Sequence, residues 1–94
     1  MRRGLFILIM LLSACAVKPP VQEMSNARSA IKAAQELPGS TQKSEALLKS
    51  AEQALEEAAE AIRQERYETA RAKAVSARRD AQAAARIKQS SGSK

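Results

Sequence analysis

Cys15 is the only cysteine of this 94-residue chain, and a thiol can act as a nucleophile once it is deprotonated. It ends the short series Leu12-Ser13-Ala14-Cys15, in which two small residues follow a leucine. Two arginines come near the start of the chain, and an unbroken apolar run over residues 5–12 ends in the leucine of this series. A basic start, a short apolar run and small residues together are typical of a secretory signal peptide. The run is too short to span a bilayer, which takes roughly 20 apolar residues.

The order of these four residues resembles the motif of the lipoprotein signal peptidase. The resemblance implies that the enzyme recognises Leu12, Ser13 and Ala14 and removes residues 1–14, so that Cys15 becomes the first residue. It also implies a diacylglycerol on the sulfur and an acyl chain on the new amine, and no other cofactor is expected. More than one acyl chain makes the anchor stable, because a single chain binds a membrane only marginally. The competing interpretation of Cys15 is an ordinary buried thiol.

Ala16 follows the cysteine. In lipoproteins of Gram-negative bacteria an aspartate at this place retains the protein at the inner membrane. The resemblance therefore implies an address at the outer membrane, lipid-anchored and facing the periplasm.

The composition argues against several classes of function. The chain has no histidine and no second cysteine, so a metal site lacks its usual ligands and nucleophilic catalysis lacks its usual base. We therefore predict no catalytic residues, no metal and no enzyme activity. The net charge of +6 would suit nucleic acid, but aromatic residues make up only 2% of the chain and stacking surfaces need them. The basic charge suits anionic lipid headgroups or an acidic wall polymer better.

The rest of the sequence predicts an all-α domain behind the signal peptide. Pro19-Pro20 favours an extended tether, and Pro38-Gly39 separates the first two predicted helices. The predicted parts are the cleaved signal peptide 1–14, the lipidated cysteine and tether 15–24, the helical domain 25–88 with helices at about 25–37, 42–64 and 67–88, and a flexible tail 89–94.

Apolar residues spaced by three and four give each predicted helix one apolar face. Ser25 or Asn26 can cap the first helix, and Ser40 or Thr41 can cap the second. The predicted faces are Met24, Ala27, Ile31 and Ala34; then Leu48, Ala51, Leu55, Ala58 and Ile62, widened by Leu47, Ala54 and Ala61; then the heptad-like, coiled-coil seam Tyr67, Ala70, Ala74, Ala77, Ala81 and Ala84.

Residues 63–66 contain neither glycine nor proline, so propensity alone allows residues 42–88 to form one continuous rod. Outer positions are mostly acidic in 42–64 and basic in 67–88, which favours an antiparallel turn that brings them together. The sequence thus predicts an Ala-rich antiparallel hairpin or a small three-helix bundle. An alanine seam buries little area, so the alternative is a seam completed by another chain.

Several short patterns resemble a family of small helical lipoproteins, the domain of unknown function 4398. They are Pro19-Pro20 with Met24; Ala27-Arg28 with Ala30-Ile31 and Ala34; Leu47, Ala51, Ala54-Leu55 and Ala58; and Tyr67, Ala70-Arg71 and Ala74. The resemblance implies an Ala-rich bundle in the cell envelope without known activity, and some members carry OmpA-like, peptidoglycan-binding domains. Members often have a glycine just before the tyrosine, where this chain has Glu65-Arg66.

A second, weaker resemblance is to murein lipoproteins of the Braun type. These also begin with a lipid-bearing cysteine, carry an alanine-rich heptad rod and end in a lysine that is joined to peptidoglycan. The resemblance implies Lys94 as a peptidoglycan attachment point, although Pro38-Gly39 interrupts a single rod. The competing interpretation of Lys94 is a solvated terminus.

Three functions remain open. The first is a structural or adaptor role, with peptidoglycan, an OmpA-like envelope protein or a second copy of the chain as partner. The second is covalent attachment of the membrane to the wall through Lys94. The third is a membrane-active small lipoprotein. This is the weakest of the three hypotheses, because a chain with few aromatic residues inserts weakly into a membrane.

Overall fold

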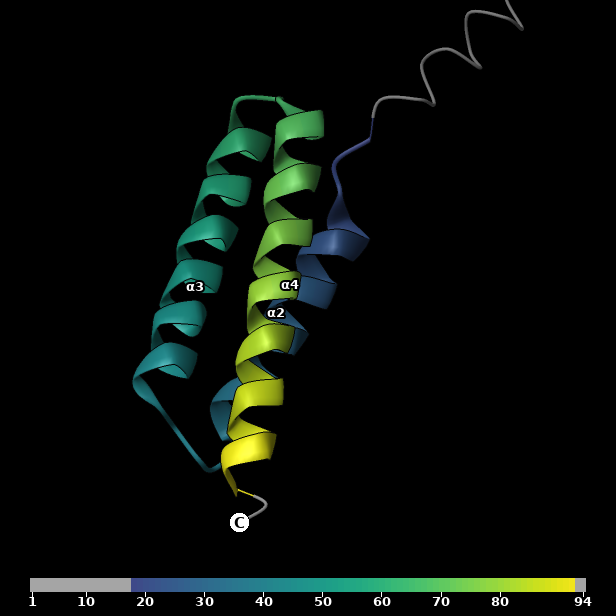
Figure 1. The fold of residues 1–94 in the computed structure, drawn as a ribbon. Helices are drawn as coiled ribbons and strands as arrows, with labels where there is room; N and C mark the ends of the chain where they lie inside the picture. Colours follow the sequence, from purple (N-terminus) through teal and green to yellow (C-terminus); the bar gives the residue numbers. More distant parts are fainter. Residues whose placement is uncertain (1–17, 93–94) are drawn as a thin grey trace, which may run out of the picture.

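The computed structural model describes residues 18–92, which form three helices and no strand. Helix α2 spans Val21–Glu36, α3 spans Gln42–Arg63 and α4 spans Tyr67–Gly92. In Figure 1 they run down, up and down as a bundle. Of the two predicted all-α arrangements, an antiparallel hairpin or a small three-helix bundle, the three-helix bundle is confirmed.

The core is a stack of four layers, and each helix gives one buried residue to each layer. α2 and α4 pass through the layers in the same direction and α3 passes in the other, so α3 is antiparallel to both. The layers are Met24 with Ala58 and Ala74, Ala27 with Ala54 and Ala77, Ile31 with Ala51 and Ala81, and Ala34 with Leu48 and Ala84. Alanine dominates, and α4 contributes alanine to every layer, so the helices can approach closely.

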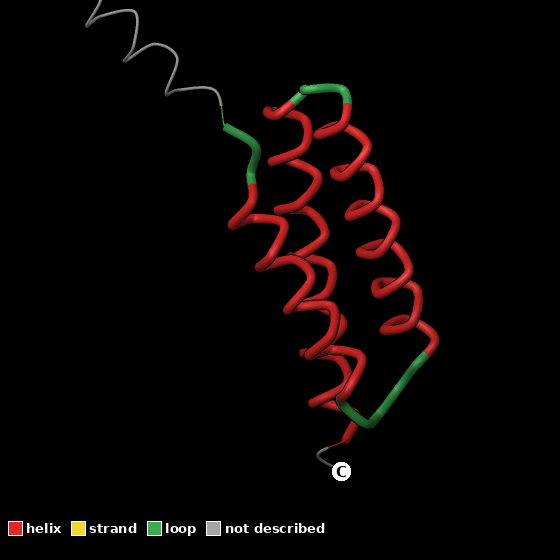
Figure 2. Tube along the Cα trace, turned by 180° about the vertical axis from the view of Figure 1, so that it is seen from behind, coloured by secondary structure: helices red, strands yellow, loops and turns green. Residues whose placement is uncertain are grey.

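α4 packs along both of the other helices, whereas α2 and α3 contact each other least. Figure 2 shows the bundle from behind, and α2 and α3 are the two helices that the connection at the lower end joins. One side of the bundle, between α2 and α3, is therefore less completely packed than the other two.

The first helix begins four residues earlier than predicted, so the predicted tether 15–24 and the domain start at residue 25 are wrong on this point. Pro20 is the N-cap residue, and its carbonyl accepts a hydrogen bond from the Met24 amide at 3.0 Å. Proline lacks an amide hydrogen, which is no loss at a helix start. Neither Ser25 nor Asn26 caps the helix, because both lie inside α2; the Asn26 side chain accepts a hydrogen bond from Gln22 instead.

The second helix starts as predicted. Thr41 and Ser44 form a reciprocal capping box: the Ser44 amide donates to the Thr41 hydroxyl at 3.0 Å, and the Thr41 amide donates to the Ser44 hydroxyl at 2.9 Å. Such a box satisfies two amides that would otherwise lack partners.

The third helix ends later than predicted. α4 continues to Gly92, so the predicted flexible tail is wrong for residues 89–92, while residues 93–94 lie outside the described part. No glycine or proline precedes Gly92 to end the helix, and the buried Lys88 side chain holds this turn against α2.

The connection between α3 and α4 is a turn and not a continuous rod. The Arg66 amide donates to the Ala61 carbonyl at 2.8 Å, and the Glu65 amide donates to the Ile62 carbonyl at 2.9 Å. This pair of bonds is a Schellman motif, which ends a helix with one residue in the left-handed region. That residue is Glu65, with a φ of 59°. Glycine adopts this φ without strain, whereas Glu65 carries a Cβ atom there.

We expect Glu65→Gly to stabilise the bundle by about 0.5–1 kcal/mol, because it removes the left-handed strain of a residue with a Cβ. Urea unfolding followed by circular dichroism measures the change. Glu52→Gly, inside α3 and exposed, is the matched control and should destabilise by about 1 kcal/mol. Destabilisation by both variants would contradict the turn described here.

Candidate functional site

The residues with predicted chemistry lie at the chain ends. Leu12, Ser13, Ala14 and Cys15, and also Lys94, are outside residues 18–92 that the structure describes. Their predicted roles in peptidase recognition, lipidation and wall attachment therefore stay predictions. The bundle itself offers surface features, and three of them are distinct enough to consider as sites.

The first feature is a groove between α2 and α3, which we call the α2–α3 groove. Its central hollow has a volume of ≈ 480 Å³, and an adjoining hollow near the start of α2 has ≈ 310 Å³. The groove is lined by Pro19, Val21, Met24, Arg28, Ile31, Lys32 and Gln35 on the α2 side and by Glu52, Leu55, Glu56, Ala59, Ile62 and Arg63 on the α3 side.

The sequence pattern predicted that Leu55 and Ile62 lie at the centre of the buried face of α3. In the structure the buried face is instead rotated about the helix axis, towards Ala54 and Ala61. Ala54 and Ala61 are buried instead, and Leu55 and Ile62 are only partly buried. Small residues face the alanine-rich α4, where the helices are close, and the larger side chains flank the core on the α2 side. The groove consequently has an apolar floor.

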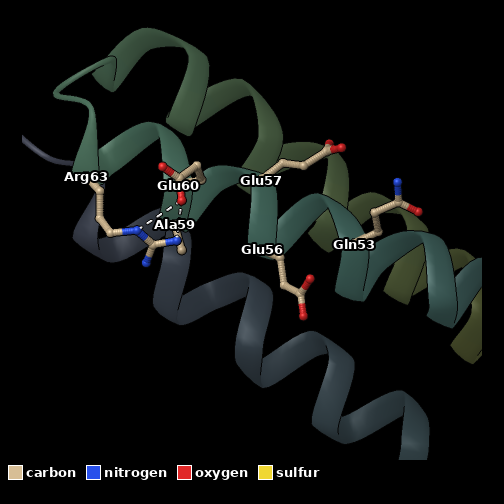
Figure 3. A pocket seen from close by; sticks show the side chains of 6 residues that line it. All are labelled: Gln53, Glu56, Glu57, Ala59, Glu60 and Arg63. Atoms are coloured by element: carbon tan, nitrogen blue, oxygen red, sulfur yellow. Dashed lines mark hydrogen bonds and ion pairs between the residues drawn. The ribbon is translucent and has the colours of Figure 1, made fainter.

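The second feature is the acidic face of α3, with a shallow hollow of ≈ 640 Å³ over it. Figure 3 shows Glu56 and Glu57 pointing in different directions from adjacent positions, while Arg63 folds back onto Glu60. The Arg63 Nη2 atom lies 2.7 Å from Glu60 Oε1. The two neighbouring carboxylates thus do not form a pair that could share a proton.

Basic neighbours hold the carboxylates of Glu57 and Glu60 in the ionised form. The hydrogen bond and positive charge of Lys73, 2.9 Å away, lower the pKa of Glu57. Hydrogen bonds from Arg63 and Gln64, and then the charge of Arg63, lower the pKa of Glu60. A lowered pKa means that the stabilisation is present above the ordinary carboxyl pKa and is lost as the pH falls through the lowered value. Both groups are exposed, so the contribution is small.

The third feature is Lys88, which the sequence pattern placed among the outer basic positions of the last helix. Its side chain is only 2% exposed, and its Nζ atom donates to the Ala34 carbonyl at 2.9 Å. Glu45 Oε1 lies 4.0 Å from the same nitrogen. The seam spacing could have revealed this burial, since Lys88 follows Ala84 by four residues and Ala81 by seven.

Lys88 acts on the last turn of α2, where backbone carbonyls lack helical partners and carry a partial negative charge. The Lys88 ammonium group donates a hydrogen bond to one of these carbonyls, and its positive charge opposes their negative charge. The geometry therefore gives Lys88 a structural role in holding the end of α2 on α4.

Within residues 18–92, no group of three side chains from histidine, cysteine, aspartate and glutamate is placed to hold a metal ion. None of the helices in this part is long and apolar enough to cross a bilayer. Exposed charged surfaces, the apolar groove and one buried amine are the features that these residues present.

The chain matches the family described as Domain of unknown function (DUF4398) over residues 22–93. This range includes α3 and α4 entirely and α2 except for its first residue. No curated protein and no solved structure matches the chain.

Proposed function

The chain belongs to the family Domain of unknown function (DUF4398), and from this premise we propose that it is a lipid-anchored lipoprotein of the bacterial cell envelope with a structural or adaptor role. The observation that carries the proposal is the series Leu12-Ser13-Ala14-Cys15 in front of the family domain. Ala16 favours the periplasmic face of the outer membrane as its address.

The short connection between Cys15 and the bundle supports this proposal. α2 begins at Val21, so the six intervening steps along the chain span at most about 20 Å even when fully extended. A lipid on Cys15 would thus hold the start of α2 close to the headgroups. A rigid domain on a short tether suits a protein that keeps a surface at a fixed height.

The arrangement of the helix ends supports a direction for that surface. The start of α2 and the α3–α4 turn lie at one end of the bundle, and the α2–α3 connection and the end of α4 lie at the other (Figure 1). α3 has 22 residues and is therefore about 33 Å long. We infer that the second end points away from the membrane, towards the wall or an envelope protein.

Cys15→Ser tests the proposal, because serine cannot form the thioether that holds the diacylglycerol. In cells grown with an alkyne-tagged fatty acid, we expect the parent chain to carry the label and Cys15→Ser to carry none. Density-gradient separation should place the parent chain with outer membranes and the variant elsewhere.

Ser13→Gly is the matched control, since it keeps a small residue in the series and should leave the label in place. A label on Cys15→Ser, or no label on the parent chain, would overturn the lipid anchor. Labelled parent chain that collects with inner membranes would overturn the outer-membrane address alone.

A further inference from the structure

The α2–α3 groove has an apolar floor on which no further element of residues 18–92 is packed. Leu55 touches three of the four core layers and is still only partly buried. Val21 is 70% exposed, at the end of the groove where α2 starts. Helix bundles of this kind bury such faces against further helices. The groove therefore has the shape and polarity of a helix-packing surface.

The two rims of the groove carry opposite charge. Arg28 and Lys32 line the α2 rim, and Glu52 and Glu56 line the α3 rim. All four side chains are exposed, and in residues 18–92 they form no ion pair with each other across the hollow. Elsewhere in the bundle the facing charges do pair, as Arg71 does with Glu23 and Lys73 with Glu57. Within the part of the chain that the structure describes, the charges on the two rims therefore have no opposite partner.

We propose that the α2–α3 groove is a self-association surface on which a second copy of the chain packs side by side and in the same direction. A two-fold axis parallel to the helices turns the groove of one copy onto the groove of the other. This rotation lays α2 of each copy against α3 of its partner and keeps every residue at its own height. The inference goes beyond the proposed function, because it depends on the groove and not on the fate of Cys15.

The core layers give the relative heights of the rim charges. Ala27 and Ala54 share a layer, and Arg28 therefore lies at a height between Glu52 and Glu56 of the antiparallel α3. Ile31 and Ala51 share the next layer, which places Lys32 within about one helical turn of Glu52. In the same-direction pair, each basic rim thus faces the acidic rim of the other copy, and it does so twice by symmetry.

The opposite orientation is disfavoured by the same charges. A two-fold axis across the helices would lay α2 on α2 and α3 on α3, so that Arg28 and Lys32 face their own copies and Glu52 and Glu56 face theirs. Like charges brought together at an interface cost several kcal/mol and reject wrong pairings. The same-direction pair also leaves the starts of both α2 helices at one end, where one membrane can hold both copies.

Charge reversal on the full chain tests the proposal. Two copies with different C-terminal tags are co-expressed, extracted in mild detergent and captured through one tag, and the amount of the other tag is measured. Arg28→Glu with Lys32→Glu, or Glu52→Lys with Glu56→Lys, should reduce co-capture about tenfold or more, because all four rims then carry one sign. The four substitutions together exchange the rims and should restore co-capture, which also shows that the substituted chain folds.

Arg79→Glu with Arg86→Glu is the matched control, with the same change of charge on exposed residues of α4. These two positions lie on the side of α4 that faces away from the groove, and co-capture should stay at the parent level. Absence of co-capture for the parent chain, equal loss in the control, or failure of the fourfold exchange to restore it would each overturn the proposal.

Discussion

Replacing Ala77 with leucine lowers the free energy of unfolding by about 1–3 kcal/mol, the usual penalty for extra methylene groups in a well-packed core. Ala77 is fully buried in a layer whose other two members, Ala27 and Ala54, are also alanines. No member of this layer can shrink to admit the larger side chain. The helices must separate instead, which disturbs the neighbouring layers. Urea unfolding followed by circular dichroism measures the loss.

Ala72→Leu is the control for this substitution. Ala72 is in the same helix but exposed, so the added side chain meets no neighbour in the core. Its effect on the free energy of unfolding should stay within about 0.5 kcal/mol, as is usual for surface substitutions. If Ala77→Leu were as mild as Ala72→Leu, the close alanine packing would be wrong.

Replacing Lys88 with methionine destabilises the bundle by about 1–3 kcal/mol, although the two side chains are similar in length. The substitution removes the hydrogen bond from Nζ to the Ala34 carbonyl. That carbonyl is then left with the longer bond from the Leu37 amide, at 3.3 Å. The end of α2 also loses a cation that opposes its partial negative charge. Thermal unfolding and amide exchange in the last turn of α2 measure the effect.

Lys73→Met is the control, since it removes a lysine of the same helix from an exposed ion pair with Glu57. Exposed pairs contribute at most about 1 kcal/mol, so this variant should lie well above Lys88→Met in stability. If the two variants were equally stable, Lys88 would not hold that helix end. The same would follow if amide exchange at the end of α2 were no faster in Lys88→Met than in the parent chain.

The buried faces of α2 and α4 could be read from the sequence, apart from the two ends of the α4 seam, because their spacing by three and four is regular. At those two ends, Tyr67 is only partly buried, and Lys88 is buried although it was predicted to lie outside. Met24, Ala27, Ile31 and Ala34 are all buried as predicted. α3 was harder to predict, because large and small apolar residues compete for its centre. Hydrophobicity favours Leu55 at the centre of the buried face, whereas close contact with the alanine-rich α4 favours Ala54. The sequence of α3 alone does not tell how close the neighbouring helices lie.

The ends of the helices are determined by local backbone geometry, which amino-acid composition predicts poorly. The turn after α3 has a non-glycine residue in the left-handed region, Glu65, so the sequence carries no turn signal there. The charge pattern favoured the turn for a reason that the structure bears out only in part. The Lys73–Glu57 pair joins α3 and α4, and Ser50 donates to Asp80 at 2.7 Å, but other basic residues of α4 turn elsewhere, as Arg71 does towards Glu23 on α2.

The α2–α3 groove was not predicted, although the sequence held a signal for it. Leu55 and Ile62 together with Ala54 and Ala61 make the apolar face of α3 wider than a two-helix seam requires. A face of that width is typical of a helix with contacts on more than one side. The structure fills one side with α4 and leaves the other as the groove.

Intact-mass measurement of the chain isolated from bacterial membranes checks whether Cys15 bears the lipid anchor. We expect a polypeptide that begins at Cys15 and is heavier than residues 15–94 by a diacylglycerol and one acyl chain, with fragmentation placing the lipid on that residue. A polypeptide that keeps residues 1–14, or one whose Cys15 carries no lipid, would contradict it.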